Sequence, residues 1–194
     1  MINTGDMVVN PSTGERLIFR QTSADTGGRL VEVEAIITPD GACAGAHVHP
    51  NQEERFQVIE GLVGFRKGGE KIVAEPGDTV VVPAGTVHRF WNAGDIDARF
   101  VCQVTPALQF EALIETMFGL AADGKTNRKG IPNPIRLAVI ADAHWDGLRA
   151  PYVPSVLQRV GLTMGAAVGR AVGYSAQYEA SQPVAVGGVA PQGA

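Results

Sequence analysis

Short apolar runs separated by turn residues dominate the first 105 residues of the chain. In the run at 30–38, Val31, Val33 and Ala35 alternate with glutamates. Alternation with a period of two is typical of a β-strand with one buried face. Further short apolar runs follow at 46–49, 55–60, 62–67, 71–74, 79–82, 88–91 and 98–104. The pattern predicts a mainly β domain, a sandwich or jelly roll, rather than alternating strands and helices.

The first residues of the chain predict a small element of their own. Two short apolar runs at 7–9 and 17–19 flank a Pro-Ser-Thr-Gly turn at 11–14. Such a turn between apolar runs is typical of a hairpin. We therefore expect an N-terminal arm at 1–29, followed by the β domain at 30–105.

After residue 105 the apolar residues recur at helical spacing. The first such run ends at Asp123 and Gly124, and we expect Thr105 to be its N-cap and Pro106 its first residue. The apolar positions of this run are Phe110, Leu113, Ile114, Met117, Leu120 and Ala121. The run predicts a helix that begins directly after the last strand.

Two more helices are expected further along the chain. Asn133 and Pro134 open one at 135–141, and another follows Pro154. We expect the helical extension at 106–180 to cover a face of the β domain or to bridge two subunits. Residues 181–194 are mostly Gly, Pro, Ala and Val without a period, which predicts a poorly ordered tail.

Three glycines at intervals of four lie in the last helical run, at Gly161, Gly165 and Gly169. In an apolar segment this spacing favours close helix contacts, as in membranes. Arg159 and Arg170, however, bracket only ten uncharged residues, and a bilayer needs about 20. We therefore expect no transmembrane segment, and close packing at a homodimer interface. Peripheral membrane attachment is the alternative.

Composition and charge narrow the class of partner. The 194 residues are 45% apolar, enough for one ordinary core, and the net charge is −4 without a basic cluster. Neutralising phosphates needs a basic face, so we expect a small-molecule partner and no nucleic acid. No secretory signal is visible in residues 1–10, which predicts a cytoplasmic protein. In that compartment Cys43 and Cys102 are expected to be separate thiols.

Three of the four histidines lie between residues 41 and 92, as His47, His49 and His88, next to the carboxylates Glu53 and Glu54. Residues two apart on a strand point to the same face, so His47 and His49 are expected side by side. A second apolar strand brings His88 after a tight turn. Imidazoles and a carboxylate at short spacing indicate a divalent metal site.

The glycines, proline and asparagine around these ligands complete two longer patterns. The first is Gly41-x5-His47-x-His49-x4-Glu54-x6-Gly61, and the second is Gly77-x5-Pro83-x-Gly85-x2-His88-x3-Asn92. Both patterns resemble the two signature motifs of the cupin superfamily at every position. The resemblance implies a single-domain cupin jelly-roll β-barrel, here with C-terminal α-helices. It also implies one divalent transition metal (Fe, Mn, Ni, Cu or Zn), held by His47, His49, Glu54 and His88.

Alternation along the strand helps to choose between the two carboxylates. Glu54 shares its inward face with Phe56 and Val58, whereas Glu53 would face outward. We therefore expect Glu54 to be the ligand and, in catalysis, a group for proton transfer.

The substrate pocket is predicted from residues near the expected ligands. Phe56 and Phe90 are expected beside the metal, where they favour an apolar substrate, although both could simply pack the core. Phe100 and Cys102 share one face of the next strand, and the sequence leaves open whether that face is inside. His144 and Tyr152 lie outside the motifs, so we expect them at the surface or in packing.

The resemblance leaves several activities open. Our first expectation is a metal-dependent oxidoreductase of the dioxygenase type, acting on a small, largely apolar substrate that chelates through adjacent oxygens. The alternatives are a zinc-dependent cyclase or isomerase and a non-enzymatic small-molecule-binding cupin. No second acid–base pair is visible in the motifs, which disfavours sugar epimerase chemistry.

Overall fold

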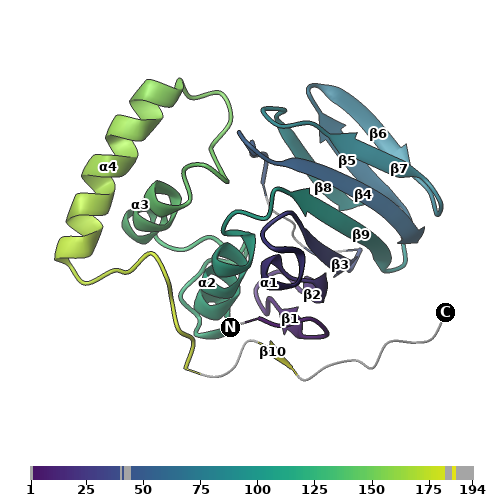
Figure 1. Cartoon of the computed structure of the whole chain (residues 1–194), viewed down its shortest axis with the longest axis horizontal. Coiled ribbons are helices and arrows are strands. Elements are labelled where there is room, and N and C mark those ends of the chain that lie inside the picture. The colour runs from purple at the N-terminus through teal and green to yellow at the C-terminus, as the bar shows by residue number, and fades with distance from the viewer. Residues whose placement is uncertain (1, 40, 42–44, 182–184, 187–194) are drawn as a thin grey trace.

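The computed structural model describes residues 2–39, 41, 45–181 and 185–186, and the part before residue 106 is mainly β-structure (Figure 1). The strands are β1 (Met7–Val9), β2 (Arg16–Gln21), β3 (Val31–Ile37), β4 (Glu53–Glu60), β5 (Val63–Lys67), β6 (Glu70–Ala74), β7 (Thr79–Val82), β8 (His88–Asn92), β9 (Ala98–Thr105) and β10 (Ala185–Val186). The helices are α1 (Ser23–Thr26), α2 (Phe110–Ala122), α3 (Pro134–Ala143) and α4 (Ser155–Ala171).

The strands form two antiparallel sheets that pack face to face. The larger sheet has the order β10-β1-β2-β3-β9-β4-β7, and the smaller one β6-β5-β8. The predicted fold class, a jelly roll with C-terminal helices, is confirmed, and its strands form two facing sheets. The sequence also predicted a strand at 46–49. Instead of a strand, these residues form two isolated β-bridges, one between His47 and His88 and one between Val48 and Arg149.

The N-terminal residues belong to the larger sheet. The predicted hairpin is confirmed as β1 and β2, and β2 pairs with β3 while β1 pairs with β10. The short helix α1 forms between β2 and β3, where the sequence analysis expected no helix. A reciprocal capping box explains it, because the side chains of Thr22 and Asp25 each bind the other's backbone N–H. Residues 182–184 and 187–194 of the expected tail lie outside the described residues.

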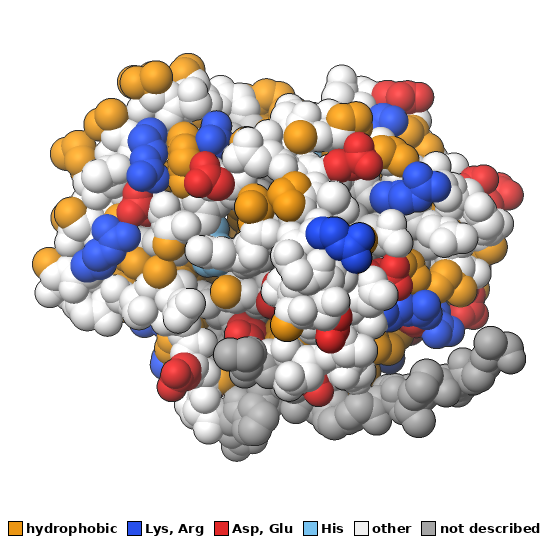
Figure 2. Space-filling model, in the orientation of Figure 1, with side chains coloured by type: hydrophobic (Ala, Val, Ile, Leu, Met, Phe, Trp, Pro, Cys, Tyr) orange, Lys and Arg blue, Asp and Glu red, His pale blue; other side chains and the backbone are white. Residues whose placement is uncertain are grey.

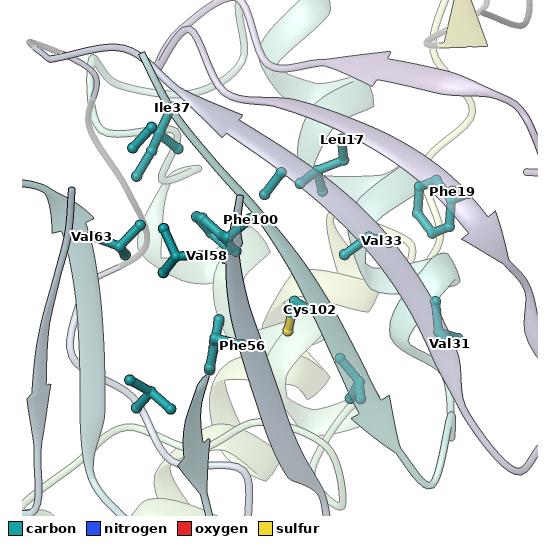
Figure 3. Packing of buried hydrophobic residues seen from close by; sticks show 14 of the residues in the cluster. Leu17, Phe19, Val31, Val33, Ile37, Phe56, Val58, Val63, Phe100 and Cys102 are labelled. Atoms are coloured by element: carbon teal, nitrogen blue, oxygen red, sulfur yellow. The ribbon is translucent and has the colours of Figure 1, made fainter. Parts of the chain in front are cut away.

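The core between the sheets is built around phenylalanines (Figure 3). Phe56 on β4 lies at the centre of this aromatic cluster, with its ring centroid 5.1 Å from that of Phe65 and 5.7 Å from those of Phe90 and Phe100. Figure 3 shows Phe56, Val58 and Phe100 directed into the space between the sheets, opposite Val63 of β5. Alternate residues of β4 therefore face this core, as the period-two pattern predicts.

The predicted start of the first C-terminal helix is wrong. Thr105 ends β9, the Thr105–Pro106 peptide is cis, and α2 begins at Phe110 with Gln109 at its N-cap. Because the ladder between β9 and β4 extends to Thr105, that residue is already committed to the sheet. The expected second helix is confirmed as α3, where the side chain of Asn133 accepts a hydrogen bond from the N–H of Arg136. The third is confirmed as α4.

Small residues let α3 and α4 pack closely. A Cβ added at Gly165 would lie 2.9 Å from Cβ of Ala138, and one at Gly169 would overlap Val139. Gly161 has nothing within 4 Å of such a Cβ, so only two of the three glycines serve this contact. Within the described part of the chain, no helix has both the length and the apolar character required to span a bilayer.

Gly61, the last residue of the first motif, gives a testable expectation for stability. Its φ is +70°, and a Cβ there would lie 2.7 Å from the carbonyl oxygen of Asp97. Gly124 has a similar φ of +66° with nothing within 4 Å. We expect Gly124→Ala to lower the free energy of unfolding by about 1 kcal/mol through backbone strain. Gly61→Ala adds the overlap and should cost about 3 kcal/mol, measured by urea denaturation. Equal losses would contradict this account of Gly61.

Candidate metal centre

The motif residues are brought together by pairing between distant segments. His88 begins β8, and the segment containing His47 is fixed to it because each of the two residues donates its N–H to the other's carbonyl at 3.0 Å. The N–H of Gly85 donates to the carbonyl of His49 at 2.8 Å. Glu54 lies on β4, whose alternation places it inside with Phe56. The backbone thus delivers three imidazoles and a carboxylate to one end of the space between the sheets.

The four side chains form a tight cluster. One possible ligand atom from each of His47, His49, Glu54 and His88 lies within 4.8 Å of the others. The ring centroids of His47 and His88 are 4.3 Å apart. Nε2 of His88 is 2.6 Å from Oε2 of Glu54, and Nε2 of His49 is 3.5 Å from Oε1. Glu54 is 5% exposed while Glu53 is exposed, so the structure brings Glu54 to the imidazoles, as alternation predicts.

Each of the three clustered histidines is oriented by a backbone carbonyl, which its Nδ1 atom contacts. Nδ1 of His47 binds the carbonyl of Gly45 at 2.7 Å, and Nδ1 of His88 binds that of Thr86 at 3.0 Å. Nδ1 of His49 binds the carbonyl of Gly147, which lies beyond α3. A carbonyl accepts only from an N–H, so these contacts assign the proton to Nδ1 and leave the lone pair of Nε2 free. That arrangement is the one in which protein imidazoles bind metals.

The electrostatics of the cluster also suit a cation. Burial and the neighbouring imidazoles lower the pKa of His47 to about 4, so its ring is neutral near pH 7. Burial would raise the pKa of Glu54, but His88 and the other two imidazoles outweigh it and hold the pKa below its usual value. The carboxylate is therefore charged, and it in turn raises the pKa of His88 against the opposing effect of burial.

The cluster leaves two buried polar atoms unsatisfied among the described residues. Nε2 of His88 and Oε2 of Glu54 are buried, and neither has a hydrogen-bond partner of acceptable geometry, although they lie close together. Unpaired buried polar atoms are costly, and a divalent cation would satisfy both. Three nitrogen donors and one carboxylate fit several transition metals, so the donor set suggests a metal site without fixing the metal.

The predicted pocket residues lie deeper in the domain. Phe56 and Phe100 are each 1% exposed and Cys102 is 5% exposed, whereas Phe90 is half-buried and contacts both phenylalanine rings. Phe100 and Cys102 lie on the buried face of β9, which settles the orientation that the sequence left open. Their role in binding substrate stays a prediction. Cys102 is a free thiol, and Cys43 lies outside the described residues.

A residue that the sequence placed outside the site lies beside it. A cavity of about 330 Å³ is lined by His49 and by residues of the C-terminal extension, including His144 at the end of α3. His144 is buried, whereas Tyr152 is 85% exposed. Figure 2 shows histidine atoms at the bottom of a hollow between the helices and the jelly roll. No local spacing connects His144 with His49, because 95 residues separate them.

Comparison with known proteins points to the part of the chain that contains the four clustered side chains. Residues 33–104 match the family model of the cupin domain. The tetracenomycin polyketide synthase protein TcmJ of Streptomyces glaucescens is 29% identical over 109 residues, covering 56% of this chain and 64% of the relative. The oxidoreductase OpS7 of Beauveria bassiana is 35% identical over 79 residues, 37% of this chain and 26% of the relative. The chain thus spans less than two thirds of either relative.

Solved structures give a more distant likeness. A predicted oxalate decarboxylase of Thermotoga maritima has a TM-score of 0.48 at 15% identity, covering 55% of this chain and 98% of that one. The family match at residues 33–104 contains both motifs and all four clustered side chains. On this family match and the two motifs, residues 33–104 of the chain form a cupin domain.

Proposed function

We propose that this cupin is a metal-dependent oxidoreductase of the dioxygenase type, acting on a small, largely apolar substrate that chelates through adjacent oxygens. The observation that carries the proposal is the convergence of His47, His49, Glu54 and His88 with two unsatisfied buried atoms. Relatives named as oxidoreductases, among them OpS7 and iacF of Pestalotiopsis fici, support the reaction class.

The chain's own residues would hold and shield the reaction site. His47, His49, Glu54 and His88 would hold one divalent transition metal, which supplies the electrophilic and redox chemistry that side chains lack. The carbonyls of Gly45, Thr86 and Gly147 keep the imidazoles oriented. The buried phenylalanines behind the site exclude water, and Glu54 is the carboxylate that could also move a proton.

Metal analysis combined with oxygen uptake tests this proposal. Protein purified without chelators should contain about one redox-active divalent metal per chain. It should consume oxygen with one member of a panel of enediols, diketones and flavonols in an oxygen electrode. The His88→Ala variant is the control and should show neither metal nor uptake. Full occupancy by zinc without oxygen uptake would refute the dioxygenase reaction.

A second candidate is a zinc-dependent cyclase or isomerase. Two relatives named as polyketide synthase proteins suggest a polyketone as its substrate: TcmJ and CurC of Streptomyces cyaneus, the latter 35% identical over 72 residues. In this case zinc would serve as a Lewis acid in the same cluster. Zinc occupancy with turnover of a polyketone and no oxygen uptake would favour this candidate, and ligand binding without turnover would indicate a non-enzymatic cupin.

We also propose that the chain forms a homodimer through the outer face of α4. Six apolar side chains, each more than half exposed, form this outer stripe: Val156, Leu157, Val160, Met164, Val168 and Val172. Figure 2 shows hydrophobic side chains along the edge of the molecule over α4. Both arginines of the helix instead bind Asp142 of α3, at 3.1 and 2.8 Å. An uncharged stripe can pack against its own copy about a twofold axis. The cytoplasmic location stays a prediction.

Sedimentation velocity tests the outer stripe. Met164→Glu places a charge in the middle of the interface, so we expect the dimer to weaken at least about tenfold, because the buried carboxylate has no partner. Val73→Glu, at a half-exposed site on β6, is the matched control and should leave the dimer unchanged. A wild-type protein that is monomeric at about 100 μM would contradict the homodimer, since a specific interface of ordinary size binds more tightly.

A further inference from the structure

The cavity beside the metal cluster is formed by two parts of the chain that lie far apart in sequence. His49 and Gln52 come from the jelly roll, whereas Leu108, Phe110 and Leu113 come from α2 and the segment before it. His144 and Asp146 close the opposite side. His49 belongs both to the metal cluster and to the cavity wall, so the cavity adjoins the cluster.

The walls of the cavity suit a small molecule with one apolar side. Leu108, Phe110 and Leu113 give it an apolar surface, and its volume of about 330 Å³ is at the small end of ligand pockets. The amide nitrogen of Gln52 is already fixed, because it donates to the carbonyls of Pro106 and Ala107 at 2.9 and 3.1 Å. Polar recognition is therefore left to the other polar side chains of the wall, among them Gln109, His144 and Asp146.

Of these three side chains, His144 is the buried one. The side chain is 5% exposed, and its ring has no hydrogen-bond partner among the described residues, although its backbone carbonyl accepts from Gly147 and Leu148. An imidazole that lines a cavity and has no partner in the protein can exchange a hydrogen bond with a bound molecule. Asp146, in contrast, is exposed to solvent.

We propose that this cavity binds the apolar body of a hydroxyl-bearing substrate and that His144 accepts the proton of that hydroxyl. The inference rests on the proposed function, because it assumes a substrate whose oxygens face the metal ligands. In the proton transfer the O–H bond breaks, the electron pair stays on oxygen and the proton moves to the free nitrogen of His144. The proton returns to the product or leaves through the mouth of the cavity to water.

The protonation state of His144 agrees with this role. Burial lowers its pKa, so the ring is neutral near pH 7 and can accept a proton. The cupin motifs supply no such base besides Glu54. The C-terminal extension would therefore complete a site that the two motifs leave without a separate base.

Binding of 4-nitrocatechol tests the inference without an assay of activity. This probe has two adjacent hydroxyls on an aromatic ring, and its visible absorption distinguishes the singly from the doubly deprotonated form. We expect His144→Gln to bind the probe about tenfold more weakly than wild type, because the hydrogen bond to a charged group is lost. In this variant, the pH at which the bound probe loses its second proton should rise by about one unit. Metal content should not change.

Two further variants keep the test decisive. Tyr152→Phe is the matched control, because Tyr152 is exposed outside the cavity, and it should match wild type in both readouts. Leu113→Trp fills the apolar side of the cavity and retains the imidazole of His144, and it should weaken probe binding at unchanged metal content. If His144→Gln does not fold, unaltered binding by Leu113→Trp overturns the proposal.

The two proposals can fail separately. Equal affinity and an equal pH midpoint in wild type and His144→Gln would overturn the role of His144, as would the absence of any probe binding to wild type. Each titration is repeated on protein stripped of metal, where binding should be weaker but still depend on His144. Protein that never takes up metal but binds the probe in this dependent way would refute the proposed function and retain the inference.

Discussion

Replacement of His88 by alanine should abolish the effect of a chelator on thermal stability. In wild type, metal at about 1,000 times its Kd stabilises the fold by about 4 kcal/mol. For a chain of this length that corresponds to a Tm higher by roughly 10 °C, which EDTA should remove. His88→Ala loses one of four clustered donors, and the outer-shell partners of metal ligands alone change affinity by about 10–100-fold. We therefore expect a larger loss of affinity and no shift with EDTA.

The difference between scans with and without EDTA makes this test specific. His88→Ala also leaves Glu54 charged and without its neighbour, which destabilises the metal-free protein by itself. That effect is present in both scans and cancels. His47→Ala and His49→Ala should, like His88→Ala, show no shift with EDTA, whereas His144→Ala should retain metal. One equivalent of metal in the three ligand variants, bound as in wild type, would refute the site.

Phe56→Ala should be the most destabilising of the core substitutions. Phe56 is 1% exposed and contacts the rings of Phe65, Phe90 and Phe100. Removal of a buried phenylalanine ring leaves a cavity and costs about 3–5 kcal/mol. Because domains are stable by only about 5–15 kcal/mol, this loss takes a large part of the total.

Urea denaturation at equal m-value measures this cost. Val73→Ala is the control, since Val73 is 49% exposed on β6, and it should change the free energy of unfolding by less than about 1 kcal/mol. Phe56→Leu retains most of the volume and should fall between the two. A loss below about 1 kcal/mol for Phe56→Ala would show that the aromatic cluster relaxes to fill the space.

The sequence predicts best where the governing interactions are local. Alternation along β4 is a property of the strand itself, and it correctly separated buried Glu54 from exposed Glu53. The opening of α3 was also predictable, because Asn133 caps it through a residue three positions away. In both places, the residues that form the sequence pattern are the same ones whose contacts determine the local structure.

Prediction failed where distant segments decide the structure. Thr105 and Pro106 have the composition of a helix start, but pairing with Glu53 on β4 retains Thr105 in the sheet. His144 has no neighbour in sequence that connects it with the metal cluster, and only the packing of the extension brings it to the cavity. Periodicity contains no information about such contacts.

The backbone bridge between Val48 and Arg149 bears on how this cupin can be divided. The two residues exchange N–H···O bonds of 3.0 and 2.9 Å, and the neighbouring carbonyl of Gly147 orients His49. The family match ends at residue 104. A fragment that ends at that boundary would contain all four clustered side chains. It would lack the segment around Gly147 and Arg149 that orients His49. The modular unit for grafting this site into another scaffold therefore extends to at least Arg149.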